Sequence, residues 1–219
     1  MLMHIFAFSF LCVGMAQDDL EKDKKLNKPS SNKSESINLF GIQVLPESRK
    51  LVVPVKVNMT RGPIEYILVH DTGKTHESLF KTSVKAEHLN AALLLLLPKK
   101  RLPSVRSLHE NQIFVQASYK DLSGNERIIN VDRWVKNSVL EKAMKPGPWG
   151  YLGSRMEGNV FVASRDGSFI AVREDADTII GNPRPESVQD DIWQANVPMD
   201  IETEQKLNLL LTVNTLNKE

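Results

Sequence analysis

Residues 64–97 read IEYILVHDTGKTHESLFKTSVKAEHLNAALLLLL, and this stretch decides the fold class. Its first seven residues are mostly β-branched, aromatic or aliphatic, a composition typical of a strand. The turn-forming residues 71–74 follow, and they predict a hairpin that returns the chain into a second strand at residues 75–81.

The end of the same stretch predicts a helix. Ser83 can cap a helix that runs from Val84 to about Leu97, with Pro98 as its stop. Residues 91–97 are all Ala or Leu, and this run is far shorter than the roughly 20 apolar residues that a membrane span needs. A helix that is apolar on every side is usually buried in a core. We therefore expect a buried Leu-rich helix.

Further strands are expected on both sides of this stretch. The expected hairpins are 42–45 with 51–57, 113–119 with 126–131 and 159–164 with 168–173, and the expected single strands are 149–152 and 207–213. The Asp166-Gly167 pair is the clearest hairpin signal. Asp132 can cap a short helix through Val135 that extends toward Ala143. The pattern predicts an α+β fold, mainly antiparallel β-sheet with one buried Leu-rich helix and one short helix.

Composition and charge are those of an ordinary globular protein. The chain has 219 residues, of which 41% are hydrophobic and 25% charged. Its 28 Lys and Arg against 27 Asp and Glu leave a net charge of +1. No overall field attracts nucleic acid or acidic lipid, so we expect no nucleic-acid partner.

The N-terminus predicts export. A short apolar run ends in Gly14 and Ala16, which supply the small residues that signal peptidase requires. We expect residues 1–16 to be a signal peptide cut near Ala16, which places the chain in the periplasm or outside the cell. An uncleaved anchor is the alternative, but the run is too short to span a bilayer. Cys12 is the single cysteine, so the mature chain has no thiol for disulfides or Cys-ligated metals.

The mature chain divides into a spacer and a domain. Residues 17–36 are rich in charged and polar side chains, and they predict a flexible polar spacer. Hydrophobic periodicity covers the rest, which predicts a single globular domain at residues 37–216 with no transmembrane segment. Asn32 and Asn58 each begin a glycosylation sequon, which matters in a eukaryotic source.

Several landmarks together resemble a known family. The residues that carry the resemblance are 41–42, 65–69, 73–79, His88 with 91–97, Trp149, 153–154, 158–161 with Ala163, and 166–167. They resemble the YdjY-like domain family of uncharacterised bacterial exported proteins over residues 37–213. The resemblance implies an exported bacterial protein with one such domain. It implies no activity and no catalytic residue.

The sharpest polar cluster is His76-Glu77-Ser78, with His88 in the following helix. On a strand, His76 and Ser78 would share one face and Glu77 the other. Two histidines and a carboxylate can ligate a metal, but their spacing matches no established metal motif. A catalytic serine has no G-x-S-x-G elbow here, at Ser78 or at Ser154. The competing interpretation is that His76 and Glu77 tie a strand to the helix start.

Aromatic residues offer a second candidate surface. Trp149 and Tyr151 could line a groove for a peptide or carbohydrate, although such residues are more often core. We predict no metal and no cofactor. The leading hypothesis is an exported, non-enzymatic module that binds a partner protein, a peptide or an envelope component. The alternative is a metal-dependent or serine hydrolase that uses the His76-Glu77-Ser78 and His88 cluster.

Overall fold

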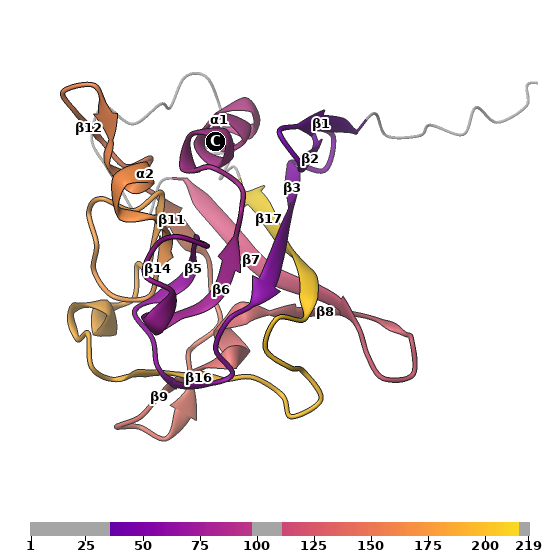
Figure 1. Cartoon of the computed structure of the whole chain (residues 1–219). Coiled ribbons are helices and arrows are strands. Elements are labelled where there is room, and N and C mark those ends of the chain that lie inside the picture. The colour runs from indigo at the N-terminus through magenta and orange to yellow at the C-terminus, as the bar shows by residue number, and fades with distance from the viewer. Residues whose placement is uncertain (1–35, 98–110, 215–219) are drawn as a thin grey trace, which may run out of the picture. The chain divides into compact units, whose positions relative to one another are not determined.

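The computed structural model describes residues 36–97 and 111–214, and Figure 1 shows how their elements are arranged. The predicted signal peptide, and the predicted spacer except for Ser36, lie outside the described residues. The described residues are mostly strand with few helices, which is consistent with an α+β class.

The elements follow in chain order. The strands are β1 (Ile37–Leu39), β2 (Ile42–Leu45), β3 (Lys50–Val57), β4 (Arg61–Pro63), β5 (Tyr66–His70), β6 (Ser78–Thr82), β7 (Gln112–Lys120), β8 (Glu126–Asn130), β9 (Val135–Asn137), β10 (Lys142–Ala143), β11 (Trp149–Tyr151), β12 (Met156–Glu157), β13 (Val160–Phe161), β14 (Ser168–Ala171), β15 (Ile180–Gly181), β16 (Trp193–Asn196) and β17 (Lys206–Asn214). The helices are α1 (Ala86–Leu96) and α2 (Val162–Asp166), with 3-10 helices η1 (Thr75–Glu77), η3 (Val131–Trp134) and η4 (Pro185–Val188).

Eight of these strands close into a barrel. Their order is β3-β17-β7-β11-β15-β14-β5-β6, and β6 returns to β3 through the pairs Lys56 with Lys81 and Val57 with Phe80. The prediction of a mainly antiparallel sheet is confirmed for most of these pairings, but it did not include the closure or the parallel pairs. The sheet is closed, and two of its pairings, β5 with β6 and β14 with β15, are parallel.

Two long, neighbouring barrel strands show why these residues form strands. β3 and β17 pair antiparallel, and on each strand alternate residues are buried. The inward residues are Leu51, Val53, Val55 and Val57 on β3, and Leu207, Leu209, Leu211 and Val213 on β17. They belong to one hydrophobic cluster that continues through the other barrel strands and α1. The period-two pattern of the sequence thus fixes which face of each strand points inward.

Helix α1 lies at one end of the barrel, and β9 and β16 of a small four-stranded sheet lie at the other end (Figure 1). The helix is shorter than predicted, and its N-cap residue is Lys85 rather than Ser83. One face is buried through Ala86, Leu89, Ala92, Leu93 and Leu96. The opposite face is open, because Leu95 is 63% and Leu94 is 38% exposed. The prediction of a helix buried on all sides is therefore wrong for half of its surface.

The predicted hairpin at residues 64–81 is also wrong. β5 and β6 run parallel, and a turn followed by η1 carries the chain back between them. All of β6 except Lys81, and all of β5 except His70, is buried. Burial on both faces is typical of parallel strands, and it explains the near-continuous apolar run of β5.

A second hairpin signal has a different meaning in the structure. Asp166 ends α2, and Gly167 is its left-handed C-cap with φ 66°. The Asp-Gly pair therefore ends a helix instead of turning a hairpin. α2 is the short helix of the fold, because Asp132 starts no α-helix: residues 131–134 form η3, and the chain then enters β9. The hairpins β2–β3 and β7–β8 confirm the predictions made from local turns.

Candidate functional site

A cleft lies between α1 and the β12–β13 hairpin, and we call it the helix–hairpin cleft. Its volume is about 540 Å³. It is lined by Glu87, Asn90, Ala91 and Leu94 of α1, and by Gly153, Ser154, Arg155, Met156, Asn159 and Phe161. Met156 is 59% exposed. The cleft thus combines accessible apolar side chains with charged and amide groups.

The floor of the cleft rests on Tyr151. Its buried hydroxyl donates a hydrogen bond of 2.7 Å to Oδ1 of Asn90, which joins β11 to α1. Burial raises the pKa of Tyr151 to about 12. Gly153 lies against this hydroxyl with φ +74°, and a Cβ there would come within 2.8 Å of the Tyr151 oxygen. A side chain at this point of the floor would therefore strain the backbone and press on the Tyr151 hydroxyl.

Ser154 follows Gly153 and also has a left-handed backbone, with φ 56°. Its hydroxyl donates to the carbonyl of Asp177 and accepts a 3.1 Å hydrogen bond from the Ala163 amide. The side chain therefore ties the segment before β12 both to α2 and to the loop before β15. These hydrogen bonds give Ser154 a structural task and explain its unusual backbone.

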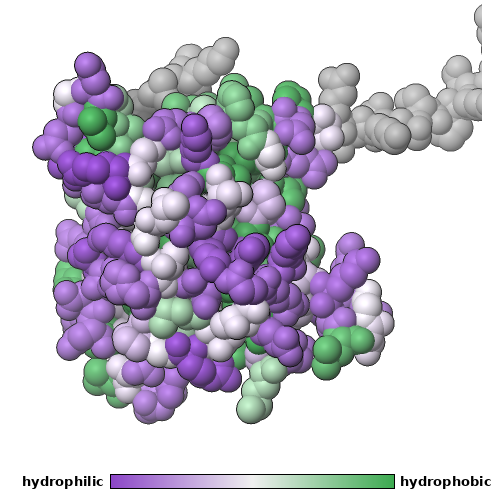
Figure 2. All heavy atoms as spheres, in the orientation of Figure 1, coloured by the Kyte–Doolittle hydropathy of each residue, from purple (hydrophilic) through white to green (hydrophobic). Residues whose placement is uncertain are grey.

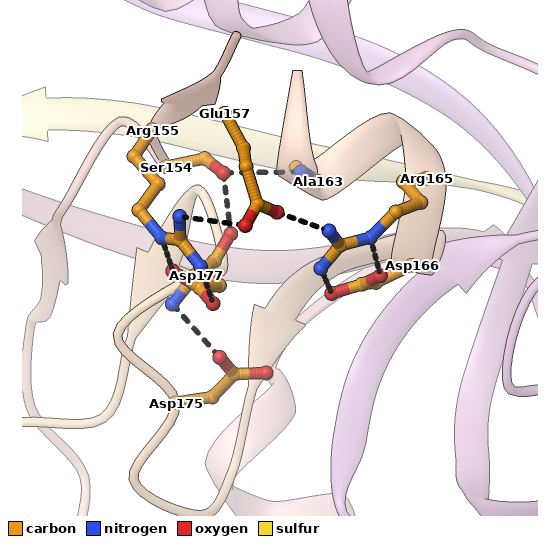
Figure 3. A network of polar contacts seen from close by, with 8 residues as sticks. All are labelled: Ser154, Arg155, Glu157, Ala163, Arg165, Asp166, Asp175 and Asp177. Atoms are coloured by element: carbon orange, nitrogen blue, oxygen red, sulfur yellow. Dashed lines mark hydrogen bonds and ion pairs between the residues drawn. The ribbon is translucent and has the colours of Figure 1, made fainter. Parts of the chain in front are cut away.

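A chain of ion pairs supports the hairpin (Figure 3). Arg155 donates two hydrogen bonds to the Asp177 carboxylate, at 2.7 and 3.2 Å. Arg165 of α2 pairs with Asp166, and it also pairs with Glu157 of β12. Figure 3 shows that Glu157 lies between the two arginines. Arginine–carboxylate forks of this kind fix orientation as well as charge.

The network continues behind the cleft to Tyr66. Asp175 accepts the Asp177 amide at 2.8 Å and the Tyr66 hydroxyl at 3.0 Å. Lys74 donates to the same Tyr66 oxygen at 2.7 Å, and Arg173 lies at 3.3 Å from it. Burial raises the pKa of Tyr66, so its hydroxyl stays protonated as a donor to Asp175. The hairpin is thereby linked to the barrel strand β5.

Glu87 provides charge at the rim of the cleft. Its pKa is lowered, first by a hydrogen bond from Ser164 at α2. The carboxylate is therefore ionised near neutral pH. Arg155, the lining cation, is neutralised by Asp177. The cleft therefore presents the Glu87 carboxylate next to its apolar wall.

The structure does not bring the four residues of the expected polar cluster, His76, Glu77, Ser78 and His88, together in one site. His76 is exposed, and its Nε2 lies 3.6 Å from the Glu77 carboxylate. Ser78 is fully buried, and both its carbonyl and its hydroxyl accept hydrogen bonds from Nδ2 of Asn58, at 2.9 and 3.1 Å. His88 stacks on Phe40 with ring centroids 3.9 Å apart. None of His76, Glu77, Ser78 and His88 is among the residues that line the cleft.

The structure also bears on metal ligation and on the glycosylation sequons. Within residues 36–97 and 111–214, no group of three or more His, Cys, Asp or Glu side chains could hold a metal ion. The Nδ2 of Asn58 donates to the carbonyls of Thr75 and Ser78, so the sequon nitrogen is engaged in the folded chain. The sequon at Asn32 lies outside the described residues.

The predicted aromatic residues lie in the core. Trp149 has no exposed surface, and its Nε1 donates to Asp132 at 3.1 Å. Arg184 pairs with the same carboxylate at 2.8 Å and lies over the Trp149 ring. Burial raises the pKa of Asp132, and the positive charge of Arg184 offsets part of this rise. Tyr151 reaches the cleft only from beneath, through Asn90.

Sequence reasoning missed the residues that form the cleft walls. Asn90 and Met156 carried no motif, Leu94 was noted only as part of the Leu-rich run, and the three come together only through tertiary packing. A partial signal did exist, because Gly153-Ser154 and 158–161 are among the stretches on which the predicted resemblance to the YdjY-like domain rests.

Comparison with protein-family models, curated proteins and solved structures finds no match. The resemblance to the YdjY-like domain stays a prediction. Among the described residues, no helix is long and apolar enough to cross a membrane.

Proposed function

We propose that this chain is an exported, non-enzymatic binding module, and that the helix–hairpin cleft holds an apolar side chain of an extended peptide from a partner protein. The observation that carries the proposal is the exposure of Leu94 and Met156 at the walls of the cleft. Ligand sites are commonly concave and apolar, with a few polar groups that fix orientation. A volume of about 540 Å³ is within their usual range.

The charge at the rim of the cleft determines which class of peptide the cleft favours. Glu87 keeps its carboxylate ionised, whereas Arg155 is neutralised by Asp177. A ligand with a Lys or Arg beside its apolar residue would therefore be favoured over one with an acidic residue. The expected motif is an apolar side chain next to a cation.

Rigidity supports binding in this cleft. The hairpin wall is held by Arg155 with Asp177 and by Arg165 with Glu157, and the helix wall by the Tyr151–Asn90 hydrogen bond. A preformed cleft loses little conformational entropy when a ligand enters. By contrast, the hydrolase alternative draws no support from Ser78, whose hydroxyl is buried against Asn58.

Export is part of the proposal and rests on the apolar leader that ends at Ala16. N-terminal sequencing of the protein from its native host tests it separately. Cleavage near Ala16 is expected, and a cytosolic protein with an intact leader would contradict export.

The binding proposal is tested by selecting linear peptides from a random display library on the full-length mature chain. We expect enriched peptides with an apolar residue beside Lys or Arg. Their affinity should fall at least about tenfold in Met156→Lys, because an ammonium group would enter the apolar wall and face the ligand's own cation.

Met199→Lys is the matched control, because Met199 is 93% exposed and does not line the cleft. Binding by this variant should equal that of the wild type. Peptides that bind Met156→Lys and the wild type equally well would contradict the proposal.

A further inference from the structure

Three lysines lie side by side on the outer wall of the barrel. Lys56 of β3 is the register partner of Lys81 on β6 and of Lys206 on β17. Register partners on neighbouring strands point to the same face, with Cβ atoms about 5 Å apart. The three ammonium groups therefore form one row across three strands, in a region of the surface where hydrophilic residues cover β3 and β6 (Figure 2).

Like charges directly opposite each other destabilise a sheet, so the barrel gains nothing from this row. Glu204 offsets part of the repulsion. Its carboxylate pairs with Lys56 at 3.1 Å and also with Lys81. Hydrogen bonds from Lys81 and Lys56 lower the pKa of Glu204. One carboxylate between these lysines still leaves the row positively charged.

The backbone holds Glu204 in this position. Its amide donates a 2.8 Å hydrogen bond to the carbonyl of Val57, at the end of β3. Its φ is 65°, in the left-handed region that a residue with a side chain seldom adopts. The backbone of Glu204 is therefore held at the end of β3, from where its carboxylate reaches Lys56 and Lys81.

A groove of about 850 Å³ includes these lysines, and we call it the lysine groove. Thr72 and Ser83 contribute hydroxyl groups to it, and Asn208 contributes an amide. Asp71 is the one acidic residue that lines it, and its carboxylate lies 3.2 Å from Nδ1 of His70. Three lysines against Asp71 and the Glu204 carboxylate leave a net charge of +1, which rises to +2 when Glu204 is displaced. The groove is larger than a single phosphate and has hydrogen-bond donors at its edges.

We propose that the lysine groove binds a ligand with two or more adjacent phosphate groups, which displaces the Glu204 carboxylate from Lys56 and Lys81. Lysine binds phosphate as a compact point charge. A row of three lysines whose Cβ atoms lie about 5 Å apart can direct several ammonium groups to adjacent phosphates, which suits several phosphates better than one. This site is separate from the helix–hairpin cleft, and the proposal does not depend on peptide binding there.

The test is isothermal titration calorimetry of the full-length mature chain with inorganic tripolyphosphate at low ionic strength. Lys206→Gln should weaken binding about fivefold, because one ammonium contact is lost. Glu204→Gln should tighten binding by a similar factor, because the competing carboxylate is removed. Lys142→Gln, which changes an exposed lysine of β10 in the small sheet, should leave the affinity unchanged.

The comparison of Lys206→Gln with Lys142→Gln distinguishes a built site from general attraction between charges, because each variant removes one positive charge and only Lys206 lines the groove. A lack of binding by the wild type would overturn the proposal, as would equal weakening in Lys206→Gln and Lys142→Gln or weaker binding by Glu204→Gln. Sedimentation with phosphatidylcholine vesicles that contain phosphatidic acid separates a lipid headgroup from a soluble phosphate. Binding of tripolyphosphate that requires Lys206 supports the proposal, and vesicle sedimentation that also requires Lys206 assigns the ligand to the membrane surface.

Discussion

The hydroxyl of Tyr151 joins the barrel to α1 beneath the helix–hairpin cleft. It is buried, and it donates to Asn90 at 2.7 Å. The sequence predicted an aromatic ligand contact at this position, whereas the structure places the ring in the core and the hydroxyl under the cleft floor. Sequence patterns identify aromatic residues, but the direction of each ring depends on packing between segments far apart in the chain.

This placement predicts a loss of stability at alkaline pH. The pKa of Tyr151 is about 12 in the folded chain and close to 10 when unfolded. Above pH 10 the unfolded chain loses this proton first, so the free energy of unfolding falls as the pH rises from 10 to 12. The loss should be on the order of 3 kcal/mol.

Urea unfolding at a series of pH values measures this effect. Tyr151→Phe should be about 1 kcal/mol less stable than the wild type at pH 7, since it lacks the hydrogen bond to Asn90. It should also show a smaller decline between pH 10 and 12. An identical decline in both proteins would contradict the assignment to Tyr151.

At the scale of elements, the crossover between β5 and β6 passes directly over the junction of α2 and β14. The amide of His70 donates to the carbonyl of Gly167 at 2.8 Å. A Cβ on Gly73 would lie 3.0 Å from the Gly167 backbone. Both hairpin signals of the sequence, at 71–74 and 166–167, therefore belong to one close backbone contact. Turn propensity reports that the chain bends, but it does not report which strands then pair.

The contact predicts different costs for two glycine substitutions. Gly167→Ala would place a Cβ 2.7 Å from Gly73 Cα, with φ +66°, whereas Gly124→Ala at φ +81° meets nothing within 4 Å. Both substitutions place a side chain on a left-handed backbone, but only Gly167→Ala also brings its Cβ into a clash with the backbone of Gly73. Gly167→Ala should destabilise the protein by about 1–3 kcal/mol more than Gly124→Ala. Urea denaturation of the two variants measures the difference, and equal stabilities would disprove the contact.

At the scale of the whole molecule, local sequence signals predicted the fold class. The closed barrel and the cleft depend on contacts between residues far apart in the chain. The β2–β3 and β7–β8 hairpins and the position of α1 follow from turns and periodicity along the chain. Closure of the barrel depends on the β3–β6 pairing, which no local pattern specifies. The cleft likewise joins α1 to a hairpin more than fifty residues later, so its walls could not be predicted from motifs.

The central claim, that the helix–hairpin cleft holds a peptide, is tested most directly by nuclear magnetic resonance. A selected peptide is titrated into the isotope-labelled full-length mature chain, and amide shifts are mapped. We predict the largest shifts at Glu87, Ala91 and Met156, with weak effects around Lys142 on β10. Shifts concentrated away from α1 and the β12–β13 hairpin would contradict the account.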